Sequence, residues 1–147
     1  MGSLTLPAGG TVYVDAMVVI YTVELYPDYW PLMEPLWLAA KARTLEVLSS
    51  ELTIMEVLVK PLKTKDAAMI AAFERAFTGT DMRLLPITQS ILRDAAQLRA
   101  TTKLRTPDAI HAATAKQIGC SLFVTNDVGF RGVPGLPVVI LDDLRTS

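Results

Sequence analysis

Short apolar segments alternate with helical segments along the chain, and this alternation limits the folds that the chain can adopt. The expected strands are residues 11–15, 45–48, 83–85, 122–125 and 138–141. Parallel strands need long crossovers between them, and helices usually supply these crossovers. The sequence therefore predicts an α/β domain of three layers, in which helices flank a mostly parallel central sheet.

Caps and prolines place the expected helices between these strands. The helices are residues 18–25, 35–43, 51–59, 66–77, 88–100 and 106–117. Ser50 and Thr106 are typical N-cap residues, and Pro107 suits the first turn of a helix. A proline inside a helix removes a hydrogen bond, so we expect the second helix to begin at Pro35 and the third to end before Pro61.

The composition is that of a folded chain of one domain. Hydrophobic residues make up 51% and charged residues 20% of the 147 residues, which excludes a disordered protein. We expect a single domain over residues 1–147, with residues 1–10 disordered or vector-derived in part. The formal net charge of −1 argues mildly against a protein that coats nucleic acid.

The sequence also bears on location. No apolar run approaches the roughly 18–20 residues that would span a membrane. The opening residues lack the basic and apolar regions of a secretory signal. Cys120 is the only cysteine, so the chain cannot form an internal disulfide. We therefore expect a cytoplasmic protein without a membrane partner.

Four acidic residues stand at informative places in this pattern. Asp15 ends the first expected strand, and Asp127 follows the fourth. Asp108 lies in the first turn of a helix, and Glu56 lies within an apolar helix. Ligands of open α/β sheets bind at the carboxyl ends of the strands. We therefore expect the four carboxylates to meet at that edge.

Each acid taken alone also has a structural explanation. Asp15 would cap the helix that follows it, and Asp108 would favour the dipole of its helix. Asp127 would be a turn residue, and Glu56 would lie on a solvated edge of its helix. The coincidence of all four with strand ends and helix starts favours a shared site.

Carboxylates gathered in one pocket repel each other unless a cation neutralises them. Oxygen ligands favour Mg²⁺ or Mn²⁺ over zinc. With one histidine and one cysteine, the chain has no cluster of the ligands that zinc prefers. A divalent ion in such a site activates a water molecule and offsets charge on a phosphoryl oxygen. The acids therefore predict metal-dependent hydrolysis.

At these residues the chain resembles the PIN-domain family, and within it the VapC-like toxins of toxin–antitoxin pairs. The matching segments are Val12-Tyr13-Val14-Asp15, Ser50-Glu51-Leu52-Thr53-Ile54-Met55-Glu56-Val57, Thr106-Pro107-Asp108-Ala109-Ile110-His111-Ala112-Ala113-Thr114-Ala115 and Phe123-Val124-Thr125-Asn126-Asp127. They follow the family's order, with spacings of 41, 52 and 19 residues between the acids. One departure is that Ala16 and Met17 follow the first acid, where relatives often carry a small polar residue.

The resemblance implies a PIN-like domain that acts as a Mg²⁺- or Mn²⁺-dependent endoribonuclease on RNA. It implies a homodimer and inhibition by a cognate antitoxin protein. Carried over by residue, the catalytic and metal-binding acids are Asp15, Glu56, Asp108 and Asp127. Thr125 and Asn126 match the family's polar pair beside the last acid, where they would orient a metal ligand.

Other residues allow two interpretations each. Arg105 and Arg131 flank the acidic segments and would contact RNA phosphates, or they are surface arginines. His111 stands one turn after Asp108, where a general base is conceivable, although packing within the helix is the more common role. The aromatic residues of one proline-broken stretch form either core or an exposed groove for a dimer mate or antitoxin; they are Tyr26, Tyr29, Trp30 and Trp37.

Two other functions compete with a nuclease. A non-catalytic interaction module would keep the fold without productive metal binding, and Met17 and the balanced charge motivate it. A phosphoacceptor or phosphatase domain also places an acid at a strand end. It would usually need a second acid next to Asp15 or a lysine after a late strand, so the sequence favours it least.

Overall fold

The computed structural model describes residues 2–145. Within them a five-stranded sheet has the order β3-β2-β1-β4-β5, and every neighbouring pair is parallel. The strands are β1 (Thr11–Val14), β2 (Glu46–Ser50), β3 (Met82–Leu85), β4 (Leu122–Thr125) and β5 (Val138–Ile140). In the central strand, Tyr13 pairs with Leu48 on one side and with Phe123 on the other.

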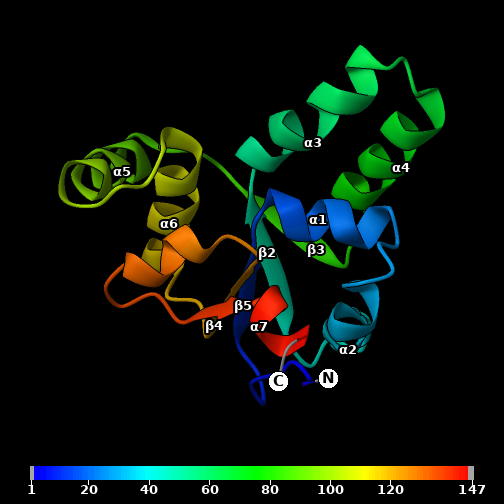
Figure 1. The fold of residues 1–147 in the computed structure, drawn as a ribbon, viewed down its shortest axis with the longest axis horizontal. Helices are drawn as coiled ribbons and strands as arrows, with labels where there is room; N and C mark the ends of the chain where they lie inside the picture. The colour runs from blue at the N-terminus through cyan, green and yellow to red at the C-terminus, as the bar shows by residue number, and fades with distance from the viewer. Residues whose placement is uncertain (1, 146–147) are drawn as a thin grey trace.

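Helices connect the strands and cover both faces of the sheet (Figure 1). They are α1 (Ala16–Val23), α2 (Trp30–Lys41), α3 (Leu52–Lys63), α4 (Ala67–Thr78), α5 (Gln89–Thr101), α6 (Thr106–Ile118) and α7 (Leu141–Arg145), with a 3₁₀ helix, η1 (Val128–Gly132). The predicted α/β class with three layers is confirmed, and the sheet is wholly parallel within the described residues.

Alternation along the strands divides the core into two parts. Val12 and Val14 of β1 pack with residues of α1, α2, α3 and α4 on one face. Tyr13 points to the other face and packs with α5, α6 and η1. The strands are buried on both faces, which explains why they are nearly continuous in apolar residues.

The proline-based helix boundaries were wrong. α2 begins at Trp30 and contains Pro35 in its interior, and α3 continues through Pro61 to Lys63. Burial of Leu32, Met33 and other residues of α2 stabilises that helix across its proline. Tertiary packing thus outweighs the local cost of one missing hydrogen bond. η1 and α7 are not among the predicted helices.

The expected starts of α4 and α5, at residues 66 and 88, each lie one residue before the first helical residue, whereas Ser50 is not the cap of α3, whose N-cap position is held by Glu51. The side chains of Asp66 and Thr88 accept hydrogen bonds from the first turns of α4 and α5. Gly119 ends α6 with φ +66, a left-handed conformation that glycine adopts at little cost. Thr106 is the first residue of α6 rather than its cap.

Residues 2–10, which precede β1, contain neither helix nor strand. Leu4 is nevertheless buried in the core, and the Gly2 N–H donates to the Leu144 carbonyl. Met1, part of the segment expected to be disordered or vector-derived, lies outside the described residues. Among residues 2–145, no helix is long and apolar enough to cross a membrane.

Candidate active site

The four predicted acids line one pocket at the carboxyl edge of the sheet, with a volume of about 530 Å³. Asp15 follows β1 and Asp127 follows β4, which are neighbouring strands. Glu56 comes from α3, which begins after β2, and Asp108 comes from the first turn of α6. β1 lies where the chain's path across the sheet reverses, the usual place for a ligand site in this type of sheet.

Asp15 has both the cap role and a place in the pocket. One of its carboxylate oxygens accepts the Val18 N–H at 3.2 Å, and the other accepts the Thr125 hydroxyl. Burial raises the pKa of Asp15, and the Glu56 charge raises it further. Thr125, His111 and the Val18 N–H oppose this shift in the pKa. The local bonds therefore hold an acid in place in a setting that disfavours its charge.

Asp127 lies near enough to Asp108 to affect the pKa of Asp108. Burial is the largest cause that raises the pKa of Asp108, and the charges of Asp127, Asp15 and Glu56 add to it. Asp127 also caps η1, because its side chain accepts the Gly129 N–H at 2.8 Å. The turn interpretation of Asp127 is thus correct locally, and it does not exclude a place in the pocket.

Glu56 forms a hydrogen bond with His111, the single histidine of the sequence. Its Oε1 lies 2.6 Å from His111 Nε2, and His111 Nδ1 lies 2.7 Å from the Tyr13 hydroxyl. The His111 side chain is 2% exposed and that of Glu56 is 24% exposed. His111 therefore bridges α6, α3 and β1 rather than packing only within its helix, and Glu56 is not on a solvated edge.

Sequence reasoning missed this network, although one signal pointed to it. Tyr13 is a polar interruption in the buried segment Val12-Tyr13-Val14, and a buried phenol needs a hydrogen-bond partner. Burial raises the pKa of Tyr13 well above its usual value, and Asp15 and Glu56 add to this shift. The phenol therefore remains protonated.

The predicted supporting residues divide into two groups. Thr125 is buried and contacts Asp15 as expected. Asn126 lines the pocket, but its amide donates to the Tyr21 hydroxyl at 3.2 Å and its carbonyl accepts the Asp142 N–H at 2.8 Å. Asn126 therefore joins α1 to α7 and holds no acid of the site.

The two arginines lie outside the lining of this pocket. Arg105 precedes α6 at the N-cap position and is exposed. Arg131 is exposed and forms an ion pair with Asp143. Both arginines are therefore surface residues, and within residues 2–145 neither forms an ion pair with an acid of the pocket.

The donor chemistry of the pocket fits a hard divalent cation. Its ionisable donors are mainly carboxylates, and their mutual repulsion contributes to the raised pKa of Asp108. Within residues 2–145, no three acidic, histidine or cysteine side chains are close enough to form a ready ligand cluster. Mg²⁺ suits such spacing, because it keeps several waters and often binds through one or two carboxylates. Asp15, Glu56, Asp108 and Asp127 are the residues that would hold it.

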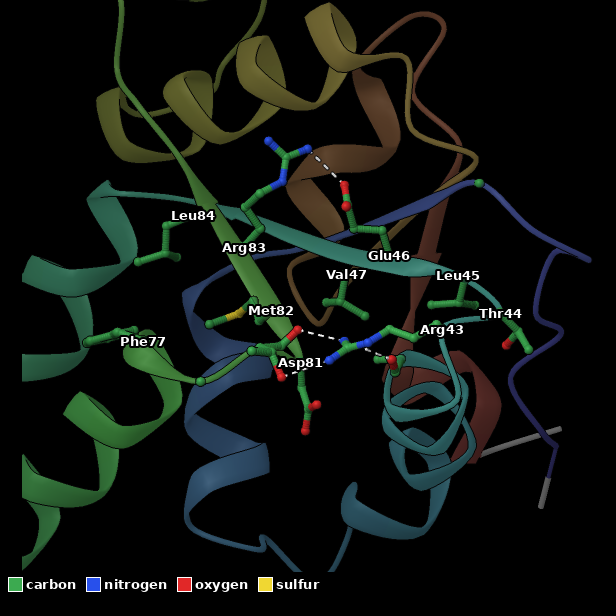
Figure 2. A pocket seen from close by; sticks show the side chains of 14 residues that line it. Arg43, Thr44, Leu45, Glu46, Val47, Phe77, Asp81, Met82, Arg83 and Leu84 are labelled. Carbon is green, nitrogen blue, oxygen red and sulfur yellow. Dashed lines mark hydrogen bonds and ion pairs between the residues drawn. The ribbon is translucent and has the colours of Figure 1, made fainter.

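A larger pocket of about 780 Å³ lies at the opposite edge, where β2 and β3 begin (Figure 2). Arg43, with a left-handed φ of +61, donates to the Thr80 carbonyl and hydroxyl, each at 2.8 Å. Arg83 pairs with Glu46 at 2.8 Å. These cations are neutralised or bonded within the protein, and the pocket contains none of the predicted site residues. Its size therefore does not make it the better candidate.

The aromatic stretch lies partly in the core. Tyr29 and Trp37 are buried, whereas Tyr26 is 44% exposed. Trp30 and Trp37 also line an apolar pocket of about 520 Å³ between α1, α2 and α4. The core interpretation is therefore correct for two of the four residues, and a groove exists beside them.

Comparisons with known proteins agree with this architecture. A chain of the VapBC2 complex from Rickettsia felis, solved with a promoter DNA fragment, has a TM-score of 0.72 at 16% identity, over 88% of this chain and 98% of that chain. A toxin–antitoxin complex from Klebsiella pneumoniae has a TM-score of 0.66 at 26% identity, over 87% and 95%. FitAcB from Neisseria gonorrhoeae has a TM-score of 0.62 at 19% identity, over 86% and 95%.

Comparison of the sequence with known families agrees with this structural likeness. No curated protein matches the chain in sequence. The PIN domain family matches residues 12–136, a range that includes all four acids of the pocket. The chain therefore belongs to the PIN domain family.

Proposed function

We propose that the protein is a Mg²⁺- or Mn²⁺-dependent endoribonuclease, the cytoplasmic toxin of a toxin–antitoxin pair. PIN domains are generally nucleases. The observation that carries the proposal is the convergence of Asp15, Glu56, Asp108 and Asp127, which are far apart in the sequence, on one pocket. Structural likeness to chains of toxin–antitoxin complexes supports the toxin role.

The chain's own residues would bind and orient the reactants. Asp15, held by Thr125 and the Val18 N–H, would provide the most rigid carboxylate, and Asp108 and Asp127 would complete the anionic site. A bound divalent ion supplies an activated water and offsets the phosphoryl charge. Arg105 and Arg131 remain the proposed contacts to RNA phosphates, which would position the strand without reading its sequence.

Cleavage of labelled RNA with and without Mn²⁺ tests the proposal. We expect EDTA to abolish cleavage and Asp15→Asn to reduce it at least about 100-fold, since loss of a residue that only supports a metal ligand already costs 10–100-fold. Asp94→Asn makes the same change on the exposed surface of α5 and should cleave normally. Cleavage that persists in chelator would rule out the metal-dependent mechanism.

A catalytically weak interaction module is the second candidate. Ala16 and Met17 follow Asp15, Glu56 is bonded to His111, and the described residues contain no ready ligand cluster. Titration calorimetry with Mn²⁺ separates the two functions. Binding that Asp108→Asn abolishes counts against the module, whereas absence of binding by the unmodified protein favours it.

We also propose that two copies pair through α3. This helix is apolar on its buried face at Val57 and Pro61, and also on the opposite, exposed face. The exposed residues of this face are Met55, Val59 and Leu62, which are 60%, 43% and 58% exposed. Half-buried Leu52 continues the stripe toward the start of α3, although it also packs against the core on the side of α5 and α6. The spacing of 3, 4 and 3 residues is that of a helix–helix seam. A helix that is apolar on opposite faces is usually buried on both.

The stripe is symmetric about Val57, which favours a second copy as the occupant. In an antiparallel pair, Leu52 of one copy faces Leu62 of the other, and Met55 faces Val59. The same symmetry sets Glu51 against Lys63, opposite charges that are both exposed at the ends of α3. A two-fold interface needs a surface that complements itself in this way.

A cognate antitoxin is the remaining partner that we propose. Support comes from the similar chains, which were solved in toxin–antitoxin complexes. A small protein that co-purifies with this chain and blocks RNA cleavage would identify it. A partner that leaves cleavage unchanged would not be an antitoxin of the proposed kind.

A further inference from the structure

A chain of side-chain hydrogen bonds joins β1, which Asp15 follows, to α3 and α6, which carry Glu56 and Asp108. It runs from the Tyr13 hydroxyl to His111 Nδ1, and from His111 Nε2 to Glu56 Oε1. Tyr13 stands two residues before Asp15 on the path of β1, and His111 stands three residues after Asp108 on α6. The network therefore relates the positions of three acids that lie 41 or more residues apart.

The chemistry of the groups determines the direction of these bonds. An ionised carboxylate only accepts hydrogen bonds, so Nε2 of the imidazole must donate to Glu56. In the neutral ring Nδ1 then accepts, and the Tyr13 O–H donates to it. The ring is also packed edge-on to Tyr13, with centroids 5.8 Å apart. Bonds at both nitrogens and packing at its side restrict the imidazole to one orientation.

We propose that His111 is a positioning residue that holds Glu56 in the acidic pocket, with Tyr13 as its anchor. His111 bonds to Glu56 Oε1, and among residues 2–145 no hydrogen bond occupies Oε2 of this pocket-lining residue. The role rests on the proposed function, because Glu56 matters for catalysis only if the pocket binds a metal ion. Such support is known to set the strength of metal binding through the ligand that it orients.

Mn²⁺ affinity, measured by calorimetry, tests this role without reliance on activity. His111→Leu keeps the side chain's bulk but removes the donor to Glu56, and we expect it to weaken Mn²⁺ binding about 10-fold or more. His111→Gln retains an N–H donor near the position of Nε2, and it should restore much of the affinity. Tyr13→Phe keeps the stack on Phe123 and should give an intermediate loss. Equal affinities in His111→Leu and the unmodified protein, or no recovery in His111→Gln, would overturn the proposal.

The imidazole provides a second readout, because His111 is the only histidine and its NMR signals need no assignment. We expect the nitrogen shifts to change in both Glu56→Gln and Tyr13→Phe, because each ring nitrogen bonds to one of these side chains. Shifts unaffected by Glu56→Gln would contradict the network. Thermal denaturation of each variant checks that it folds. If His111→Leu does not fold, Tyr13→Phe, which is the mildest of the changes, takes its place in these measurements.

These readouts separate the failure of the inference from that of the proposed function. If the unmodified protein binds no Mn²⁺, the metal-dependent function fails. A crystal structure of His111→Leu, or of Tyr13→Phe if the former does not fold, then decides the positioning role. Displacement of Glu56 from the pocket would support this role, and an unmoved Glu56 would overturn it.

Discussion

At the scale of single residues, the same atoms serve local structure and the pocket. Asp15 caps α1 through Val18, and Asp127 caps η1 through Gly129. A cap explanation and a site explanation for these acids are therefore compatible. Local geometry orients each carboxylate, and the fold decides which other charges it meets.

Ionisation of the pocket acids together should lower the free energy of unfolding. The pKa of Asp108 is raised in the folded protein despite the favourable helix dipole, so burial and repulsion outweigh that dipole. A carboxyl whose folded pKa exceeds its unfolded value contributes stability at low pH, and this contribution is lost as pH rises through the folded pKa. The folded protein thus carries a penalty at neutral pH that acid removes.

Asp108→Asn should therefore raise the melting temperature at pH 7.5. We expect a rise of at most a few degrees, since solvent screens this half-buried group. The difference from the unmodified protein should shrink toward pH 4, and Mn²⁺ should stabilise the unmodified protein more than the variant. Thermal denaturation measures each effect, and a lower melting temperature of Asp108→Asn at pH 7.5 would contradict the explanation.

At the scale of elements, α2 shows how packing outweighs a local signal. Pro35 lies inside this helix, where it lacks the N–H that would bond to the carbonyl of Pro31. Four large side chains that the helix buries compensate for the missing bond; they are Leu32, Met33, Leu36 and Trp37. The proline alone gives no information about this compensation.

Pro35→Ala should stabilise the protein, because the residue is exposed and the new N–H completes the helix. We expect the free energy of unfolding to rise by roughly 2 kcal/mol. This value is smaller than the full cost of a proline inside a helix, because alanine also makes the unfolded chain more flexible. Pro31→Ala is a matched control in the first turn of the same helix and should change little. Urea denaturation gives both values, and equal effects of the two variants would refute the explanation.

At the scale of the whole molecule, α3 connects the site to the proposed dimer. Glu56 of α3 lines the pocket, and Met55, Val59 and Leu62 of the same helix are exposed. Figure 1 shows α3 and α4 as a hairpin that extends beyond the sheet. Pairing through this hairpin would place two acidic pockets in one assembly.

Leu62→Lys should weaken this dimer. Each dimer loses two buried leucines, so we expect the dissociation constant to rise at least about 10-fold. Leu38→Lys is a matched control, because Leu38 on α2 is also 58% exposed. Sedimentation analysis measures the dissociation constant of each variant. Equal dissociation constants for Leu62→Lys and Leu38→Lys would exclude α3 as the interface.

Charge exchange tests the antiparallel register. Glu51→Lys and Lys63→Glu should each dimerise poorly alone at low salt, because like charges then face each other at both ends. A mixture of the two variants should form a heterodimer, in which both pairs are opposite in charge. Failure of the mixture to associate better than either variant would reject this register.

The sequence by itself determined the fold class and the places of the acids relative to the strands and helices. These features depend on short-range physics: side-chain periodicity, capping and the parallel crossover. Only the tertiary structure decided the strand order, the persistence of α2 and α3 through their prolines, and the bonds of Glu56 to His111 and of Arg131 to Asp143. Burial and pairing between distant residues set these outcomes, and their free energies have no signature in the neighbouring sequence.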